Sequence, residues 1–208
     1  VTLFNRSNTL LRGFDEDIAA RFTELFAERV NLRLGVVPTH VERTADGIAL
    51  TVGAETVIVD ELLVATGREP NSDLVDVKSG GIACHHRGTV VVDDTMATNV
   101  ENVWAIGDIA NSYQLKHLAN AEASVAFWNI AHPNDVRRQS YKAVPGAVFS
   151  NPQVASVGLT EQEAVAQGLP FKVGKRDYAG TAYGWAIVDE SSFAKVIVNT
   201  ETGLIIGA

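Results

Sequence analysis

The chain has 208 residues, enough for one large domain or for parts of two or three. Its hydrophobic share of 46% and charged share of 20% are typical of a globular protein and exclude a disordered chain. The net charge of −8 disfavours nucleic acid and acidic membrane surfaces as partners. One cysteine excludes an intrachain disulfide framework and fits a cytoplasmic location, and no apolar run reaches the roughly 20 residues of a membrane span.

The N-terminal region has the pattern of a strand, a loop and a helix. Residues 1–4 are predicted as a strand. An amphipathic helix is predicted from Asp15 to about residue 29, because four apolar residues recur at helical spacing: Ile18, Phe22, Leu25 and Phe26. Both chain ends read as strands and the first residue is Val1 rather than Met. Since unpaired strand edges are a liability, we expect an internal segment of a longer polypeptide.

The loop between this strand and helix is rich in cations. Asn5 ends the strand, Arg6 and Arg12 follow, and no carboxylate occurs before Asp15. In a Rossmann unit, a carboxylate after the second strand selects a free ribose 2′-hydroxyl, whereas arginines accept a 2′-phosphate. Two solvated loop arginines are the alternative interpretation.

The next region is predicted to be a β-meander. Residues 37–43 and 48–52 flank an Asp46-Gly47 turn, which predicts a hairpin, and residues 55–59 would add a third strand. Residues 60–67 are predicted as a buried strand that ends in small residues.

The most informative stretch lies at residues 98–108. An apolar run at residues 103–106 predicts a buried strand, and Gly107-Asp108 stops it. Open α/β sheets bind ligands at such carboxyl-terminal edges, and the carboxylate of Asp108 would accept hydrogen bonds from sugar-type hydroxyls. A helix predicted from about residue 115 to Trp128 would point the positive end of its dipole at the same ligand.

Two further regions complete the chain. Cys84, His85 and His86 form the only Cys/His cluster, which lacks the paired spacing of a zinc site and is interpreted as a loop before a strand at 89–93.

After a polar boundary at 129–140, Thr160 and Glu163 form a predicted capping box for a helix ending near residue 167. Strands predicted at 171–178, 193–199 and from 204 onward complete an α+β region.

Three strings in this order resemble the class I pyridine nucleotide-disulfide oxidoreductase family, and the resemblance covers the whole chain. They are Ala-Thr-Gly-Arg-x-Pro-Asn at 65–71, Thr-x4-Val-Trp-Ala-Ile-Gly-Asp at 98–108, and Phe-x-x-Pro followed by Val-Gly-Leu-Thr-Glu-x-x-Ala at 149–164. The resemblance implies an α/β fold with incomplete Rossmann-like FAD- and NAD(P)-binding portions and an incomplete α+β dimerisation domain. The implied divisions are the later half of the NADPH domain (1–70), the second FAD segment with a linker (71–143) and the first half of the dimerisation domain (144–208).

The resemblance also implies site residues. Asp108, beside Gly107, would bind the ribityl chain of FAD, and Arg6 and Arg12 would bind the NADPH 2′-phosphate, as a pair at this separation does in the glutathione reductase branch. The other implied cofactor-binding positions are Gly67 and Gln114 on the nicotinamide side, and Leu115, Lys116 and His117 at the helix start beside the flavin. His117 is expected to act through its backbone rather than its ring.

The implied protein is a homodimeric disulfide reductase that uses NADPH and FAD to reduce a small-molecule disulfide. This chain contains no Cys-x4-Cys pair, so no residue is assigned as nucleophile or general base, and no metal is implied. Two alternatives stay open. One is an NAD enzyme similar to dihydrolipoamide dehydrogenase, which would carry an acidic residue near Asn5, and the other is a noncatalytic dimerisation or folding module without FAD.

Overall fold

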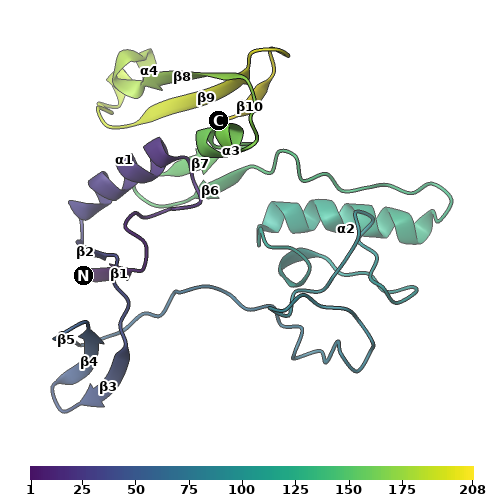
Figure 1. Ribbon diagram of the computed structural model, residues 1–208, viewed down its shortest axis with the longest axis horizontal. Coiled ribbons are helices and arrows are strands. Elements are labelled where there is room, and N and C mark those ends of the chain that lie inside the picture. The colour runs from purple at the N-terminus through teal and green to yellow at the C-terminus, as the bar shows by residue number, and fades with distance from the viewer. The chain divides into compact units, whose positions relative to one another are not determined.

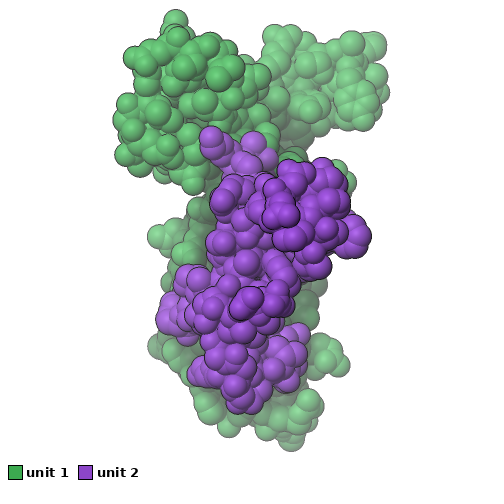
Figure 2. Space-filling view, turned by 90° about the vertical axis from the view of Figure 1, so that its right-hand side faces the viewer, with its two compact units in different colours: residues 1–64, 145–208 green, residues 65–144 purple.

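The computed structural model describes all of residues 1–208, which form two compact units. Val1–Val64 and Pro145–Ala208 together make the first unit, and Ala65–Val144 makes the second (Figures 1 and 2). The first unit contains all the strands and three of the helices, whereas the second is built around one long helix. None of the helices is long and apolar enough to cross a membrane.

The first unit begins with a βαβ element. Strand β1 (Thr2–Asn5) pairs in parallel with β2 (Asn31–Leu34), and helix α1 (Glu16–Ala27) joins them. The helix forms because its apolar residues fall on one side, where Ala19 and Phe22 are buried. The predicted strand and helix are therefore confirmed within a residue or two of their expected ends.

The predicted meander is also present. Strands β3 (His40–Thr44), β4 (Gly47–Val52) and β5 (Glu55–Val59) form an antiparallel sheet with β4 in the middle. Glycine is suited to the turn between β3 and β4 because Gly47 has a positive φ of 133°. Leu50 on the central strand is almost fully buried, so this small sheet has its own apolar contact layer.

Three predicted strands are wrong. Residues 60–67 form no strand, and Leu63 and Val64 are 88% and 70% exposed, because no other strand pairs with this segment. The segments 89–93 and 103–106 contribute only single bridges, Cys84 with Val90 and Ala97 with Trp104. An apolar run becomes a regular strand only where a neighbouring backbone pairs with it over several residues.

The second unit contains the short turn η1 (Gly107–Ile109) and helix α2 (Lys116–Ala131). The predicted helix start is confirmed, and the helix runs three residues past Trp128. Its inner side is buried at four positions with helical spacing: Leu118, Glu122, Ala126 and Asn129. Met96 and Val90 complete the core of this unit, and both are almost entirely inaccessible to solvent.

The C-terminal part has the predicted α+β character. A two-stranded sheet of β6 (Gly146–Val148) and β7 (Val154–Ser156) precedes helix α3 (Glu161–Ala166). The predicted capping box is confirmed, because the Thr160 hydroxyl accepts from the Glu163 N–H and the Glu163 carboxylate accepts from the Thr160 N–H. The remaining elements are listed in chain order: β8 (Phe171–Asp177), η2 (Tyr178–Gly180), α4 (Ala182–Ala186), β9 (Phe193–Asn199) and β10 (Ile205–Gly207).

A buried ion cluster connects the two sequence segments of the first unit. The Nζ atom of Lys195 on β9 lies 2.7 Å from Asp15 Oδ1, 3.0 Å from Asp17 Oδ2 and 2.6 Å from Glu161 Oε2. Asp15 also accepts from the backbone N–H groups of Asp17 and Glu161, so it caps α1 and holds the first residue of α3. One lysine and one aspartate therefore connect α1, α3 and β9.

The cluster shifts the pKa values of both central groups. Burial alone would raise the pKa of Asp15, but hydrogen bonds from Lys195 and from the Glu161 and Asp17 N–H groups outweigh it and hold the pKa below 3.8. Burial alone would lower the pKa of Lys195, but its hydrogen bonds to Asp15, Glu161 and Asp17 raise the pKa above 10.5. Both groups are therefore charged throughout the neutral range.

Replacing Lys195 by methionine should lower the free energy of unfolding by about 3 kcal/mol, because Asp15 would stay buried without a counter-charge. Lys175→Met is the matched control, since Lys175 lies 3.8 Å from Asp17 but is 42% exposed, and it should cost about 1 kcal/mol or less. Urea denaturation of the full-length protein measures both losses. Equal losses would contradict a special role for the buried lysine.

The same pair predicts a pH dependence. The Asp15 contribution is complete above its unfolded pKa of about 3.8 and is lost as the pH falls through the lower folded value. The Lys195 contribution is complete below 10.5 and is lost as the pH rises through the higher folded value. The stability difference between wild type and Lys195→Met should therefore be constant between about pH 5 and 9 and shrink below about pH 4. A difference that stays unchanged at pH 3 would exclude this assignment.

Candidate functional site

The turn at Gly107-Asp108 places an exposed carboxylate beside a buried glycine. Gly107 has a φ of +72°, which favours glycine, and an added Cβ would lie 3.3 Å from the Cβ of Ala119 on α2. Its N–H donates to the carboxylate of Glu122 at 2.6 Å. The Asp108 side chain is 54% exposed, so its carboxylate is directed to solvent and can accept hydrogen bonds from a ligand.

Arg68 lies beside this carboxylate. Its Nη1 atom is 3.7 Å from Asp108 Oδ2 and donates to the backbone oxygen of Gln114 at 3.3 Å. The Arg68 side chain is 65% exposed, and exposed ion pairs contribute little to stability. The contact therefore leaves Asp108 available, and it brings the predicted site residue Gln114 next to the turn.

The start of helix α2 supplies the positive end of a dipole near the turn. Leu115 precedes the helix in an extended conformation and provides no side-chain cap, and Lys116 and His117 are its first residues. Gln114 just before it has a φ of +55°. No acidic residue lies in the first helical turn.

A hydrogen-bond network that the sequence did not predict lies behind the turn. Glu122 is fully buried, and its carboxylate accepts from the Asn111 side chain at 2.9 Å and from the Tyr141 hydroxyl at 2.8 Å as well as from Gly107. Asn111 Oδ1 accepts in turn from the N–H of Gln114. Burial and the hydrogen bond to Glu122 raise the pKa of the Tyr141 hydroxyl. In the sequence, the indication of this network was that Glu122 is a carboxylate within a run of small and apolar residues of a predicted helix.

Arg6 and Arg12 lie in the loop after β1, in the other compact unit. The side chain of Asn5 donates to the backbone oxygens of Ser7 at 2.9 Å and Thr9 at 3.0 Å, which fixes the course of the loop. Both arginines are exposed, and neither forms an ion pair with a carboxylate of the chain. Their charges are therefore available to an anionic ligand.

Gly67 lies in the irregular segment that precedes Arg68. It is exposed and has a φ of +145°, and an added Cβ would meet nothing within 4 Å. The second unit thus contains Gly67, the Asp108 turn, Gln114 and the start of α2, whereas the loop with the two arginines belongs to the first unit.

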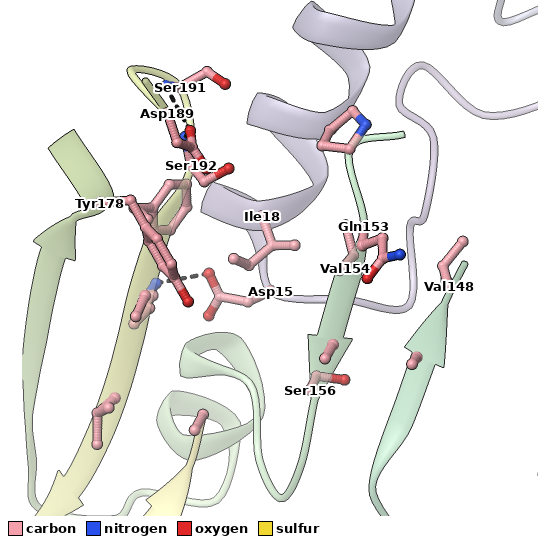
Figure 3. Close-up of a pocket in the computed structure, with 18 of the residues that line it drawn as sticks. Asp15, Ile18, Val148, Gln153, Val154, Ser156, Tyr178, Asp189, Ser191 and Ser192 are labelled. Carbon is pink, nitrogen blue, oxygen red and sulfur yellow. Dashed lines mark hydrogen bonds and ion pairs between the residues drawn. The ribbon is translucent and has the colours of Figure 1, made fainter. Parts of the chain in front are cut away.

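The Cys84 cluster and a cavity of the first unit contain none of the predicted site residues. Cys84 is half-buried, its neighbours His85 and His86 are exposed, and no group of three or more His, Cys, Asp or Glu residues could hold a metal ion. A cavity of about 910 Å³ in the first unit is lined by α1, β7 and the segment between α4 and β9 (Figure 3). Its labelled lining residues are Asp15, Ile18, Val148, Gln153, Val154, Ser156, Tyr178, Asp189, Ser191 and Ser192, and none is a predicted site residue.

The fold combines a parallel βαβ element with antiparallel α+β sheets. The chain belongs to the pyridine nucleotide-disulphide oxidoreductase family. The model of that family matches residues 1–123, and the model of its dimerisation domain matches residues 144–208. The family and the fold class predicted from the sequence are both confirmed.

Individual relatives agree with this assignment. Mycothione reductase of Mycobacterium tuberculosis is 39% identical over the whole of this chain, which covers 46% of that enzyme. Dihydrolipoyl dehydrogenase of Geobacillus stearothermophilus is 35% identical over the whole of this chain, which covers 45% of that enzyme. The HOCl-induced flavoprotein disulfide reductase RclA of Escherichia coli has a TM-score of 0.89 at 25% identity, covering 100% of this chain and 48% of that structure. The chain therefore spans about half the length of the relatives that it matches.

Proposed function

We propose that the chain is part of an FAD- and NADPH-dependent disulfide reductase, with the disulfide of mycothiol as its substrate. The observation that carries the flavoprotein proposal is the exposed Asp108 carboxylate on a glycine turn, next to the uncapped start of α2. The substrate is supported by the strings at 113–123 and 182–186, which resemble mycothione reductase, and by the 39% identity to that enzyme.

FAD fits the second unit because that unit offers what a polyhydroxylated, electron-accepting group requires. Asp108 would accept a hydrogen bond from a ribityl hydroxyl, and the positive φ of Gly107 forms the turn that presents this carboxylate. The first residues of α2, from Leu115 to His117, would favour negative charge at the flavin edge through the helix dipole. Bound FAD would carry electrons from NADPH toward the dithiol that attacks the substrate.

NADPH fits the loop of the first unit. Arg6 and Arg12 would bind the 2′-phosphate by charge-assisted hydrogen bonds, and Asn5 holds the loop that presents them. Gly67 and Gln114 would line the nicotinamide side. No residue between Asn5 and Phe14 is acidic, which favours NADPH over the NAD expected for a dihydrolipoyl dehydrogenase.

The noncatalytic alternative is a dimerisation or folding module that holds no flavin. Its discriminating observation is simple, because bound flavin gives visible absorbance. A colourless full-length protein that cannot be reconstituted with FAD would favour the module.

Arg12→Ala should weaken NADPH binding by about 10- to 150-fold and leave NADH nearly unchanged, because it removes one charge-assisted contact of roughly 1.5–3 kcal/mol. Arg43→Ala is the control, since Arg43 is equally exposed on β3 and outside the loop. Titration of the full-length protein with each nucleotide gives the dissociation constants. Equal losses for both nucleotides would remove the 2′-phosphate assignment.

Asp108→Ala should raise the FAD dissociation constant by about 10- to 150-fold, because the ribityl chain loses a charge-assisted acceptor. If Asp108 only supports the turn, Asp108→Asn should be neutral for FAD and Asp108→Ala should cost about 1 kcal/mol of stability in the flavin-free protein. Dialysis with flavin fluorescence, beside thermal unfolding of the flavin-free protein, separates these outcomes. An alanine variant that retains FAD like wild type would leave only the turn function.

We also propose that the full-length protein is a homodimer through the region from 144 onward. This region matches a dimerisation domain and exposes large apolar side chains, among them Phe149 at 88% and Trp185 at 79%. Sedimentation velocity at micromolar concentration should give twice the monomer mass. A single monomeric species without exposed apolar surface by dye binding would contradict the proposal.

A further inference from the structure

We propose that Glu122 is a positioning residue for flavin binding, whose buried carboxylate fixes both the Gly107-Asp108 turn and the approach to α2. The inference rests on the proposed role of Asp108 in FAD binding. Glu122 itself points into the protein and would not touch the cofactor, because none of its surface is exposed.

Every hydrogen bond of the Glu122 carboxylate is accepted from a neutral donor. Oε2 accepts from the Gly107 N–H at 2.6 Å, while Oε1 accepts from the Asn111 amide at 2.9 Å and from the Tyr141 hydroxyl at 2.8 Å. No lysine, arginine or histidine forms an ion pair with it. An ionised carboxylate satisfies this arrangement because it is an acceptor at both oxygens.

The network holds the turn at both ends. Gly107 donates to Glu122 at the start of η1, and the Asn111 amide at the end of the turn donates both to Glu122 and to the Gly107 carbonyl oxygen at 3.1 Å. Asp108 lies between these two fixed points. Its backbone position is therefore set by a side chain that projects from the second turn of α2.

The same network continues to the residues before α2. Asn111 Oδ1 accepts from the N–H groups of Tyr113 at 2.9 Å and Gln114 at 3.0 Å. The ring of Tyr113 stacks on that of Tyr141 at 5.7 Å between centroids, and Tyr141 returns a hydrogen bond to Glu122. Through Asn111 the carboxylate thus fixes the acceptor at Asp108 relative to the positive end of the helix.

An apolar side chain could fill the space of Glu122 but could not accept the hydrogen bonds that hold the turn. A buried carboxylate without a cation carries a large desolvation cost, which its hydrogen bonds must offset. Leucine at this position would fill similar space, but it would leave the Gly107 N–H without an acceptor and remove one of the two acceptors of the Asn111 amide. The hydrogen bonds that Glu122 makes to the Gly107-Asp108 turn therefore explain why a carboxylate occupies this buried position.

Glu122→Gln in the full-length protein tests the proposal, because glutamine keeps the shape but replaces one acceptor oxygen by a donor that faces Gly107, Asn111 or Tyr141. We expect the FAD dissociation constant to rise about 10-fold or more, and Tyr141→Phe, which removes one donor, to raise it about 3-fold. Glu163→Gln is the matched control, since Glu163 accepts similar hydrogen bonds in the other unit and should leave FAD affinity unchanged.

Combination with Asp108→Ala distinguishes positioning from general stabilisation. If Glu122 acts through Asp108, adding Glu122→Gln to Asp108→Ala should raise the FAD dissociation constant by less than about 3-fold more. Independent, multiplied effects, or single variants that unfold more easily yet bind FAD like wild type, would overturn the inference. Undiminished FAD binding by Asp108→Ala alone would overturn the role of Asp108 on which this inference rests, whereas a full-length protein that cannot be reconstituted with FAD would overturn the proposed function itself.

Discussion

The contact between Lys195 and Asp15 is the interaction on which the first unit depends. Two charges removed from water would destabilise the fold unless each had several partners. Lys195 has three carboxylates around its ammonium group, and Asp15 has two backbone N–H groups in addition to the lysine. Because Asp15 also caps α1, the loss of the lysine would disturb a helix of residues 1–64 and a strand of residues 145–208 at once.

Each unit contains a buried carboxylate, and the two are stabilised by different kinds of partner. In the first, a cation neutralises Asp15, and the result is a rigid connection with fixed charges on both sides. In the second, the Glu122 carboxylate accepts hydrogen bonds from neutral donors alone. The first arrangement suits a permanent joint between segments. The second orients the backbone of the Gly107-Asp108 turn through neutral donors.

Local patterns in the sequence predicted what local interactions determine. The apolar side of α1, the capping box of Thr160 and the Asp-Gly hairpin all depend on residues a few positions apart, and all are present. The segment 60–67 could not be predicted in this way, since an apolar run says nothing about whether a partner strand lies beside it. The absence of pairing there is a property of the rest of the fold.

The site shows the same division. The family motif and the turn chemistry drew attention to Gly107 and Asp108, and the structure places them on an exposed turn. Arg68, Asn111 and Tyr141 were missed because their contacts join positions 4 to 46 residues apart, and no spacing rule relates them. Asn5 was noted only as a residue that is not acidic, whereas its amide holds the loop of the two arginines in place.

The division of the chain has a consequence for its synthesis. The second unit is one continuous stretch, so all its partners have been made once Val144 has left the ribosome. The second unit interrupts the first in sequence, and Lys195, which neutralises Asp15, follows it 180 residues later in the chain. At a translation rate of roughly 5–20 residues per second, α1 spends on the order of ten seconds or more without its counter-charge. Within this chain, the segment of the first unit that is made earlier is therefore completed last, and during that interval the apolar side of α1 is open to chaperones.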